Sequence, residues 1–185
     1  GAYSVTRFSC AWHTVPLADP DAPALDMLAF IVGQGRSSRL VRNILERRRL
    51  VDGISANSYT PKDPGLFGIE ATFQPEKEAE ALAAIEEEVR TWSVKPFTPA
   101  EIEKARRNMI QQTIAGLQTA NGQATSLASD QFYASDYAFS ETYLQRLAAI
   151  TPDSLRAVAA RYLTPAGRTA VVLAPRRPAE AALPD

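Results

Sequence analysis

Apolar and polar residues alternate in two stretches of the chain, one at its start and one before its midpoint. These stretches span residues 7–13 and 66–73, and their period of two predicts half-buried β-strands. Residues 51–60 precede the second stretch across a turn containing proline and glycine, so the pair predicts a hairpin. A further apolar run at 169–174 predicts a closing strand. The residues expected to face the core in the first and third of these strands are Phe8, Cys10, Trp12, Phe67, Ile69, Ala71 and Phe73.

Helical spacing of apolar residues occupies most of the remaining sequence. One predicted helix begins at Thr98-Pro99-Ala100-Glu101, a capping box with proline at the first helical position. Because the strands and helices largely do not alternate, the pattern favours an α+β fold with helices packed on a mainly antiparallel sheet. The predicted helices are 24–32, 40–45, 82–92, 99–134 with an interruption at 116–122, and 152–162. In the second helix the inward residues are Leu40, Val41, Ile44 and Leu45, and the outward ones are Arg39, Arg42, Arg47 and Arg49.

Composition indicates one ordinary domain. The chain of 185 residues can bury a full core. Its 20 basic and 21 acidic residues give no global attraction to nucleic acid or to an anionic membrane. A single cysteine excludes an internal disulfide framework, and no apolar run approaches the roughly 20 residues of a membrane span. We interpret residues 1–175 as one domain and 176–185 as a flexible tail, and the start at Gly1-Ala2 suggests a piece of a longer chain.

A corner is predicted between the first two helices. Glycine permits positive φ, so the two glycines there are expected to turn the backbone. One of two serines is expected to accept a hydrogen bond from the free amides that start the second helix. Two arginines lie at that helix start, where the macrodipole disfavours cations, so they are expected to reach an acidic partner. The residues of this structural corner are Gly33, Gly35, Arg36, Ser37, Ser38 and Arg39.

The corner and its neighbouring segments resemble a known family. Asp19-Pro20-Asp21-Ala22-Pro23-Ala24-Leu25 precedes the corner and Gly65-Leu66-Phe67-Gly68-Ile69 follows it. Together they resemble the second, non-zinc domain of pitrilysin/insulinase-type zinc metallopeptidases, in the branch that includes the mitochondrial processing peptidase. The resemblance covers about Phe8 to Pro175. It implies a helices-on-sheet domain that forms half of a closed proteolytic chamber without being catalytic itself.

Ligands for a catalytic zinc ion are not apparent in this sequence. Such a site needs several nitrogen or carboxylate ligands that converge on one metal, and the resembled family supplies them from an H-x-x-E-H motif. The only histidine is His13, which has no partner at ligand spacing. We interpret His13 as a strand residue facing solvent or the chamber, and we assign no metal ligand. The resemblance places zinc in a partner domain or subunit of the same family.

The resemblance also concerns two substrate-holding positions. Active members carry an arginine near the end of the second helix and a tyrosine seven residues later, which hold the substrate backbone at the zinc. The matching positions here are Leu45 and Asp52. Leu45 donates no hydrogen bond, and Asp52 would repel an oxyanion. We therefore assign no catalytic residue, and we expect Leu45 to belong to the core and Asp52 to lie on the following strand.

The arginines within residues 36–49 form a basic stripe, but no aromatic residues interleave with them, so we do not expect nucleic-acid binding.

Two interpretations of the parent protein stay open. The favoured parent is a zinc-bearing peptidase, with this domain meeting a zinc domain or subunit, in the same chain or as a heterodimer, and a peptide substrate in the chamber. The alternative is a degenerate scaffold or adaptor subunit without a proteolytic role. Similarity to bacterial pairs favours the periplasm over the cytoplasm.

Overall fold

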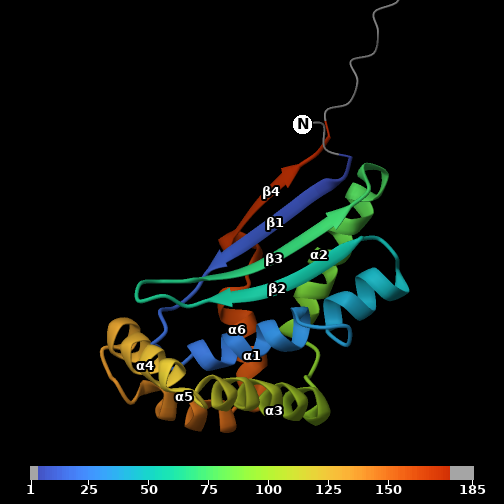
Figure 1. Cartoon of the computed structure of the whole chain (residues 1–185). Coiled ribbons are helices and arrows are strands. Elements are labelled where there is room, and N and C mark those ends of the chain that lie inside the picture. The colour runs from blue at the N-terminus through green and yellow to red at the C-terminus, as the bar shows by residue number, and fades with distance from the viewer. Residues whose placement is uncertain (1–3, 176–185) are drawn as a thin grey trace, which may run out of the picture.

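The structure, a computed structural model, describes residues 4–175 and shows helices packed against one antiparallel sheet (Figure 1). The tail predicted at 176–185 lies outside the described residues. The strands are β1 (Thr6–His13), β2 (Gly53–Tyr59), β3 (Leu66–Phe73) and β4 (Arg168–Leu173). The α-helices are α1 (Ala22–Gly33), α2 (Glu78–Trp92), α3 (Pro99–Gly116), α4 (Ala120–Ser129), α5 (Phe139–Ala148) and α6 (Pro152–Tyr162). Two π-helices, η1 (Val41–Arg47) and η3 (Asp130–Ala134), and two 3₁₀ turns, η2 (Pro75–Lys77) and η4 (Pro165–Gly167), complete the described elements.

The sheet has the strand order β2-β3-β1-β4, and each neighbouring pair is antiparallel. The register places Phe8 of β1 opposite Ala71 of β3 and Val172 of β4. The core residues expected from the period of two are all buried on one face. The predicted fold class, the hairpin and the closing strand are therefore confirmed.

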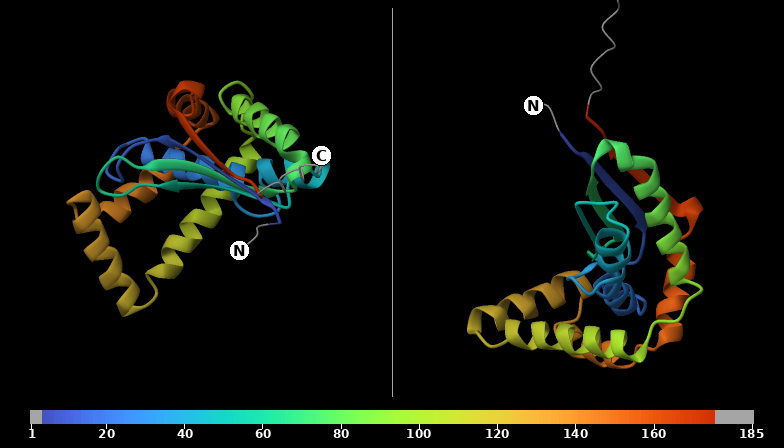
Figure 2. Two further views of the ribbon diagram at one scale, coloured as in Figure 1. Left: turned by 90° about the horizontal axis from the view of Figure 1, so that it is seen from above. Right: turned by 90° about the vertical axis from the view of Figure 1, so that its right-hand side faces the viewer.

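The helices are distributed unequally about this sheet. α2 and α6 lie behind it in the view of Figure 1, and α1 packs along β2. α3, α4 and α5 form a lobe that projects to the opposite side, past the lower end of the strands (Figure 2). We call these three helices the three-helix lobe. The molecule is therefore L-shaped in side view, with the sheet as one arm and the lobe as the other.

The helix predicted over 40–45 is the π-helix η1, a difference that short apolar patterns cannot reveal. Arg49 has φ of 52°, and this left-handed residue brings the Leu50 amide to the Ile44 carbonyl at 3.1 Å. η3 ends in the same way at Ser135, whose φ is 58°. The helix α5 was not predicted, although Phe139, Tyr143 and Leu147 recur at every fourth position, which is the spacing of an amphipathic helix.

The corner before η1 confirms part of the prediction. Gly35 has φ of 76°, but Gly33 lies inside α1, where a Cβ atom would stand 2.1 Å from the Ala56 nitrogen. Gly33 is therefore required by close packing on β2 rather than by positive φ. The predicted serine cap is wrong: the Ser38 hydroxyl is buried without a hydrogen-bond partner among the described groups, and the Ser37 hydroxyl contacts Lys104.

Arg39 joins this corner to the start of α3. It was predicted to point outward, yet it is 8% exposed, because its Nε and Nη2 atoms each donate to Glu101 at 2.8 Å. Its guanidinium also lies 4.2 Å from the Phe97 ring centre. The expectation of an acidic partner is confirmed for Arg39, whereas Arg36 is exposed and has none among the described residues.

Glu101 serves two structures at once. In the predicted capping box, which is confirmed, its Oε2 atom accepts from the Thr98 amide at 2.8 Å while it also accepts from Arg39. Burial alone would raise the pKa of Glu101, but the hydrogen bonds from Arg39 and Thr98 outweigh it and lower the pKa to about 2. The carboxylate therefore stays ionised in the folded protein well below the pH at which an unfolded glutamate takes up a proton.

The described residues contain no helix that is both long and apolar enough to span a membrane.

Replacing Glu101 by glutamine should lower the free energy of unfolding by about 2 kcal/mol at pH 7. This loss is smaller than the loss expected for breaking a fully buried ion pair, because the Glu101 side chain is 21% exposed. A lowered pKa stabilises the fold above the unfolded value of 4.5, and this contribution is lost as pH falls toward about 2. Urea unfolding at pH 7 and pH 2.5 measures both effects.

The control is Glu87→Gln, because Glu87 pairs with Arg48 on the surface, where the two side chains are 70% and 47% exposed. Its effect should stay below about 1 kcal/mol. Two results would contradict this account of the ion pair. One is a loss of unfolding free energy in Glu101→Gln that is as large at pH 2.5 as at pH 7. The other is a loss at pH 7 that is no larger than that of the Glu87→Gln control.

Candidate functional site

The candidate site is the face of the sheet opposite α2 and α6, which we call the open face. Along each strand the residues that alternate with the core point to this face, and most of them are exposed. The uncovered face looks toward the viewer in Figure 1, and the three-helix lobe projects on the same side (Figure 2). The residues on the open face that the argument uses are Arg7, Ser9, His13, Ser55, Glu70, Thr72, Val171 and Leu173.

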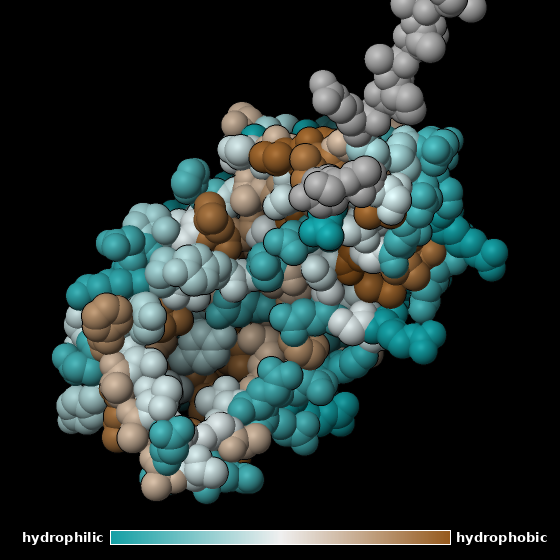
Figure 3. Space-filling model, turned by 45° about the horizontal axis from the view of Figure 1, so that its top comes forward, coloured by the Kyte–Doolittle hydropathy of each residue, from teal (hydrophilic) through white to brown (hydrophobic). Residues whose placement is uncertain are grey.

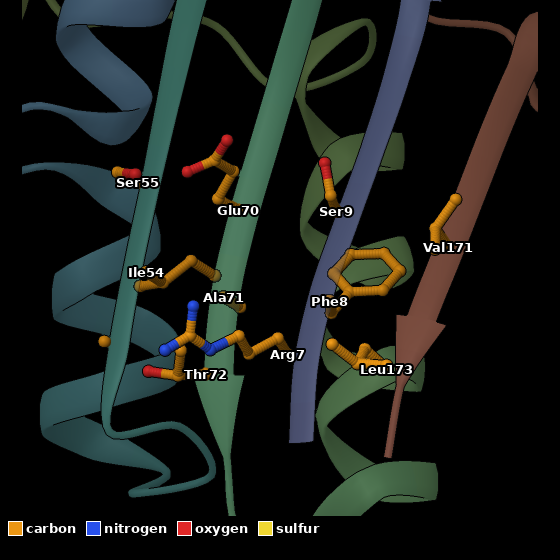
Figure 4. Close-up of a pocket in the computed structure, with 11 residues that line it drawn as sticks. Arg7, Phe8, Ser9, Ile54, Ser55, Glu70, Ala71, Thr72, Val171 and Leu173 are labelled. Carbon is orange, nitrogen blue, oxygen red and sulfur yellow. The ribbon is translucent and has the colours of Figure 1, made fainter. Parts of the chain in front are cut away.

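A shallow cavity of about 580 Å³ lies on this face and draws residues from all four strands. In Figure 4 the Glu70 carboxylate extends between Ser9 and Ser55, while the Arg7 guanidinium reaches across the sheet to the side of Thr72. One acidic group, one basic group and several hydroxyls thus lie among apolar side chains that include Val171 and Leu173. This arrangement can contact the polar groups of an extended peptide, because peptide side chains and main-chain groups need both donors and acceptors.

The open face lacks the parts of a hydrolytic centre among the described residues. A serine nucleophile needs a base within hydrogen-bond reach, and in the described part of the chain neither Ser9 nor Ser55 makes a side-chain hydrogen bond to a histidine or to the neighbouring Glu70 carboxylate. His13 was expected to face either solvent or the chamber, and it is exposed at the end of β1. No group of three or more histidine, cysteine, aspartate or glutamate residues could hold a metal ion within the described part of the chain.

The two positions that the resemblance matches to the arginine and tyrosine do not line the open-face cavity, although Asp52 borders Gly53 and Thr72, which do. Leu45 was predicted to be core but is only half-buried, because residues of a π-helix rotate less about the axis than those of an α-helix and the apolar stripe drifts. Asp52 precedes β2 by one residue and is exposed; its carboxylate accepts from Gln74 at 2.9 Å. The Asp52 amide extends the ladder to the Thr72 carbonyl at 2.7 Å.

A second polar site was missed at the sequence level. Asp26 is the only charged residue in α1, and its Oδ2 atom accepts from the Tyr143 hydroxyl of α5 at 2.8 Å. Burial raises the pKa of Asp26, partly offset by neighbouring hydroxyls. The lone aspartate within the apolar sequence Ala22–Gly33 was the available signal, but its partner lies 117 residues away in a helix that the pattern did not predict.

Comparison with known proteins identifies similar domains. A family model described as the peptidase M16 inactive domain matches residues 3–109. An uncharacterized zinc protease from Streptomyces coelicolor is 30% identical over 138 residues, which cover 74% of this chain and 30% of that protein. A probable alpha subunit of the mitochondrial processing peptidase from Schizosaccharomyces pombe is 28% identical over 86% of this chain and 34% of its own length. The chain thus spans about a third of the length of these curated relatives.

Solved structures show the same fold. The inactive peptidase domain of a zinc protease candidate from Bordetella parapertussis superimposes with a TM-score of 0.86 at 23% identity. The match covers 99% of this chain and 98% of that one. Helices on an antiparallel sheet, as expected from the sequence, are therefore the architecture of a known inactive peptidase domain.

The position of Leu45 generates a stability prediction. Leu45→Ala should destabilise the fold by about 1–2 kcal/mol, because the side chain packs against the core but is only partly buried. The neighbouring residue Ile44 is fully buried, so Ile44→Ala should lower the free energy of unfolding by more, about 2–5 kcal/mol. Thermal and urea unfolding of the two variants provide the comparison. Equal losses would contradict this account, because they would show that η1 presents both side chains to the core to the same extent.

Proposed function

This chain belongs to the peptidase M16 inactive-domain family, and from that premise we propose that it forms the non-catalytic half of a substrate chamber in a zinc metalloendopeptidase. The observation that carries the proposal is the L-shaped surface made by the open face and the three-helix lobe (Figure 2). A surface of this shape becomes a chamber wall when a second domain faces it. Zinc would come from that second domain, because His13 alone cannot hold the ion.

The contribution of this chain would be to bind and enclose the substrate. Glu70 and Arg7 offer opposite charges to peptide side chains, and the hydroxyls of Ser9 and Ser55 offer neutral hydrogen bonds. Within residues 4–175 the outer strands β2 and β4 of the sheet each leave one main-chain edge, to which an extended peptide could add as a further strand. A wall that covers the substrate excludes bulk water from the reaction and limits the size of what enters.

A scaffold or adaptor role is the second candidate. It is favoured by the residues Leu45 and Asp52, since neither can hold a substrate carbonyl in the way proposed for an arginine and a tyrosine. Under the favoured proposal those two groups would come from a different subunit. For the compartment we propose the periplasm, on the resemblance to bacterial peptidase pairs.

Reconstitution tests the proposal. The partner would be the polypeptide carrying H-x-x-E-H that is encoded with this chain, in the same gene or beside it. We expect no cleavage of quenched fluorescent peptides by the 185-residue chain alone. We expect clear cleavage when both the zinc-bearing partner and the subunit that supplies the arginine and the tyrosine are added. Assembly of these polypeptides without any gain in cleavage would favour the scaffold role instead.

A variant of the open face tests whether this face lines the substrate chamber. Ser55→Trp would place a large ring beside Glu70 in the open-face cavity, and it should lower kcat/KM of the reconstituted enzyme by about tenfold or more through misplaced substrate. Glu80→Trp is the matched control, because Glu80 is exposed on α2 behind the sheet. Equal activities of the two variants, with partner binding retained, would remove the open face from the chamber.

A further inference from the structure

A smaller cavity of about 260 Å³ lies where α1, β2, α3 and α5 meet. The molecular surface is visibly hollowed toward the end where the three-helix lobe lies (Figure 3). Asp26, Ser58, Gln112 and Tyr143 supply polar groups to this cavity from four different elements. Phe30 and Met109 supply apolar walls beside them. We call it the Asp26 cavity.

The electrostatics of the Asp26 cavity are one-sided. Of the residues that the structure describes, Asp26 is the only charged one that lines it, and its carboxylate makes no ion pair with any of them. Asp26 is partly buried, and a carboxylate withdrawn from water without a cation is costly because desolvation disfavours its charged form. Burial accordingly raises the pKa of Asp26, and the same burial beside this carboxylate raises the pKa of the Tyr143 hydroxyl.

The hydrogen bonding around Asp26 is also incomplete. Oδ2 accepts from the Tyr143 hydroxyl at 2.8 Å. The Ser58 hydroxyl lies near enough to lower the pKa of Asp26, yet this buried oxygen reaches no good hydrogen-bond geometry with any described group. A buried hydroxyl without a partner is unusual in a folded protein. The cavity therefore offers acceptors that a bound donor could use.

We propose that the Asp26 cavity binds the ammonium group of a lysine side chain presented by another polypeptide. A single carboxylate among neutral oxygens is too few anionic ligands for a divalent cation, but it suits one positive charge. The three donors of an ammonium group can bond to Asp26 and Ser58 and to the Gln112 amide oxygen at once. Phe30 and Met109 would contact the methylene stem, as apolar surfaces commonly do for lysine.

Lysine fits this cavity better than arginine. A guanidinium binds a carboxylate best through two parallel hydrogen bonds that use both carboxylate oxygens. In Asp26 one of the two oxygens already accepts from Tyr143. The compact ammonium needs only the other oxygen and finds its remaining acceptors on separate side chains. The assignment rests on this geometry and holds whether or not the chain serves a peptidase.

Binding of small probes to the ¹⁵N-labelled 185-residue chain tests the proposal. The probe is Nα-acetyl-lysine methylamide, and the matched control is the norleucine compound, which has an apolar stem without the ammonium. The lysine probe should shift the amide signals of Asp26, Ser58 and Tyr143, with an affinity at least about tenfold above that of norleucine. The arginine compound should bind more weakly than the lysine compound.

Variants of the chain separate the contributions of the Asp26 charge and of the Tyr143 hydrogen bond to lysine binding. Asp26→Asn retains the shape and should weaken lysine binding about tenfold, whereas Asp52→Asn removes an exposed carboxylate elsewhere and should leave it unchanged. Tyr143→Phe frees the second oxygen of Asp26 and should improve arginine binding relative to lysine. Thermal unfolding checks that each variant folds, and the comparison of probes on the unaltered chain decides the question even if one does not.

Several results would overturn the proposal. Equal affinities for the lysine and norleucine probes would show that charge is not recognised. Tighter binding of arginine to the unaltered chain would contradict the ammonium assignment. Signal shifts confined to other surfaces, or unchanged lysine binding by a folded Asp26→Asn variant, would place the site elsewhere.

Discussion

The ion pair between Arg39 and Glu101 joins the two arms of the molecule. Arg39 belongs to the corner that follows α1, and Glu101 lies in the first turn of α3, from which the three-helix lobe begins. The same carboxylate completes the capping box that starts α3, so one side chain fixes both where the lobe begins and how it is attached. The L shape and the Asp26 cavity, to which α3 contributes Met109 and Gln112, depend on that attachment.

The sequence predicted those parts of the fold that are set by local rules. The period of two in residues 66–73 predicts a half-buried strand, and the structure has β3 there. The capping box at Thr98 predicts a helix start, and α3 begins there. The π geometry of η1 could not be predicted, because it depends on the left-handed Arg49 and not on the apolar pattern. The burial of Arg39 was missed for a related reason: a long-range partner, 62 residues away, overrides the helix-surface position.

The candidate sites were less accessible to sequence analysis than the fold. The absence of an H-x-x-E-H motif was plain, but the polar residues of the open face come from four strands, and only pairing reveals that they share a face. The Asp26 cavity depends on Tyr143, which lies in a helix that was not predicted although its apolar residues have helical spacing. Placing a carboxylate there without a cation costs stability, which is typical of residues placed for binding rather than for folding.

The central claim is that the open face lines a chamber when a zinc-bearing partner is bound. The most direct test is the alkylation rate of a cysteine introduced by Ser55→Cys, measured with a bulky maleimide, against one introduced by Glu80→Cys behind the sheet. Burial raises the pKa of the native Cys10 thiol to about 11, so this residue stays unreactive. The account predicts that the partner slows alkylation at position 55 and leaves position 80 unchanged. Protection at position 80 alone, or at neither position despite binding, would contradict it.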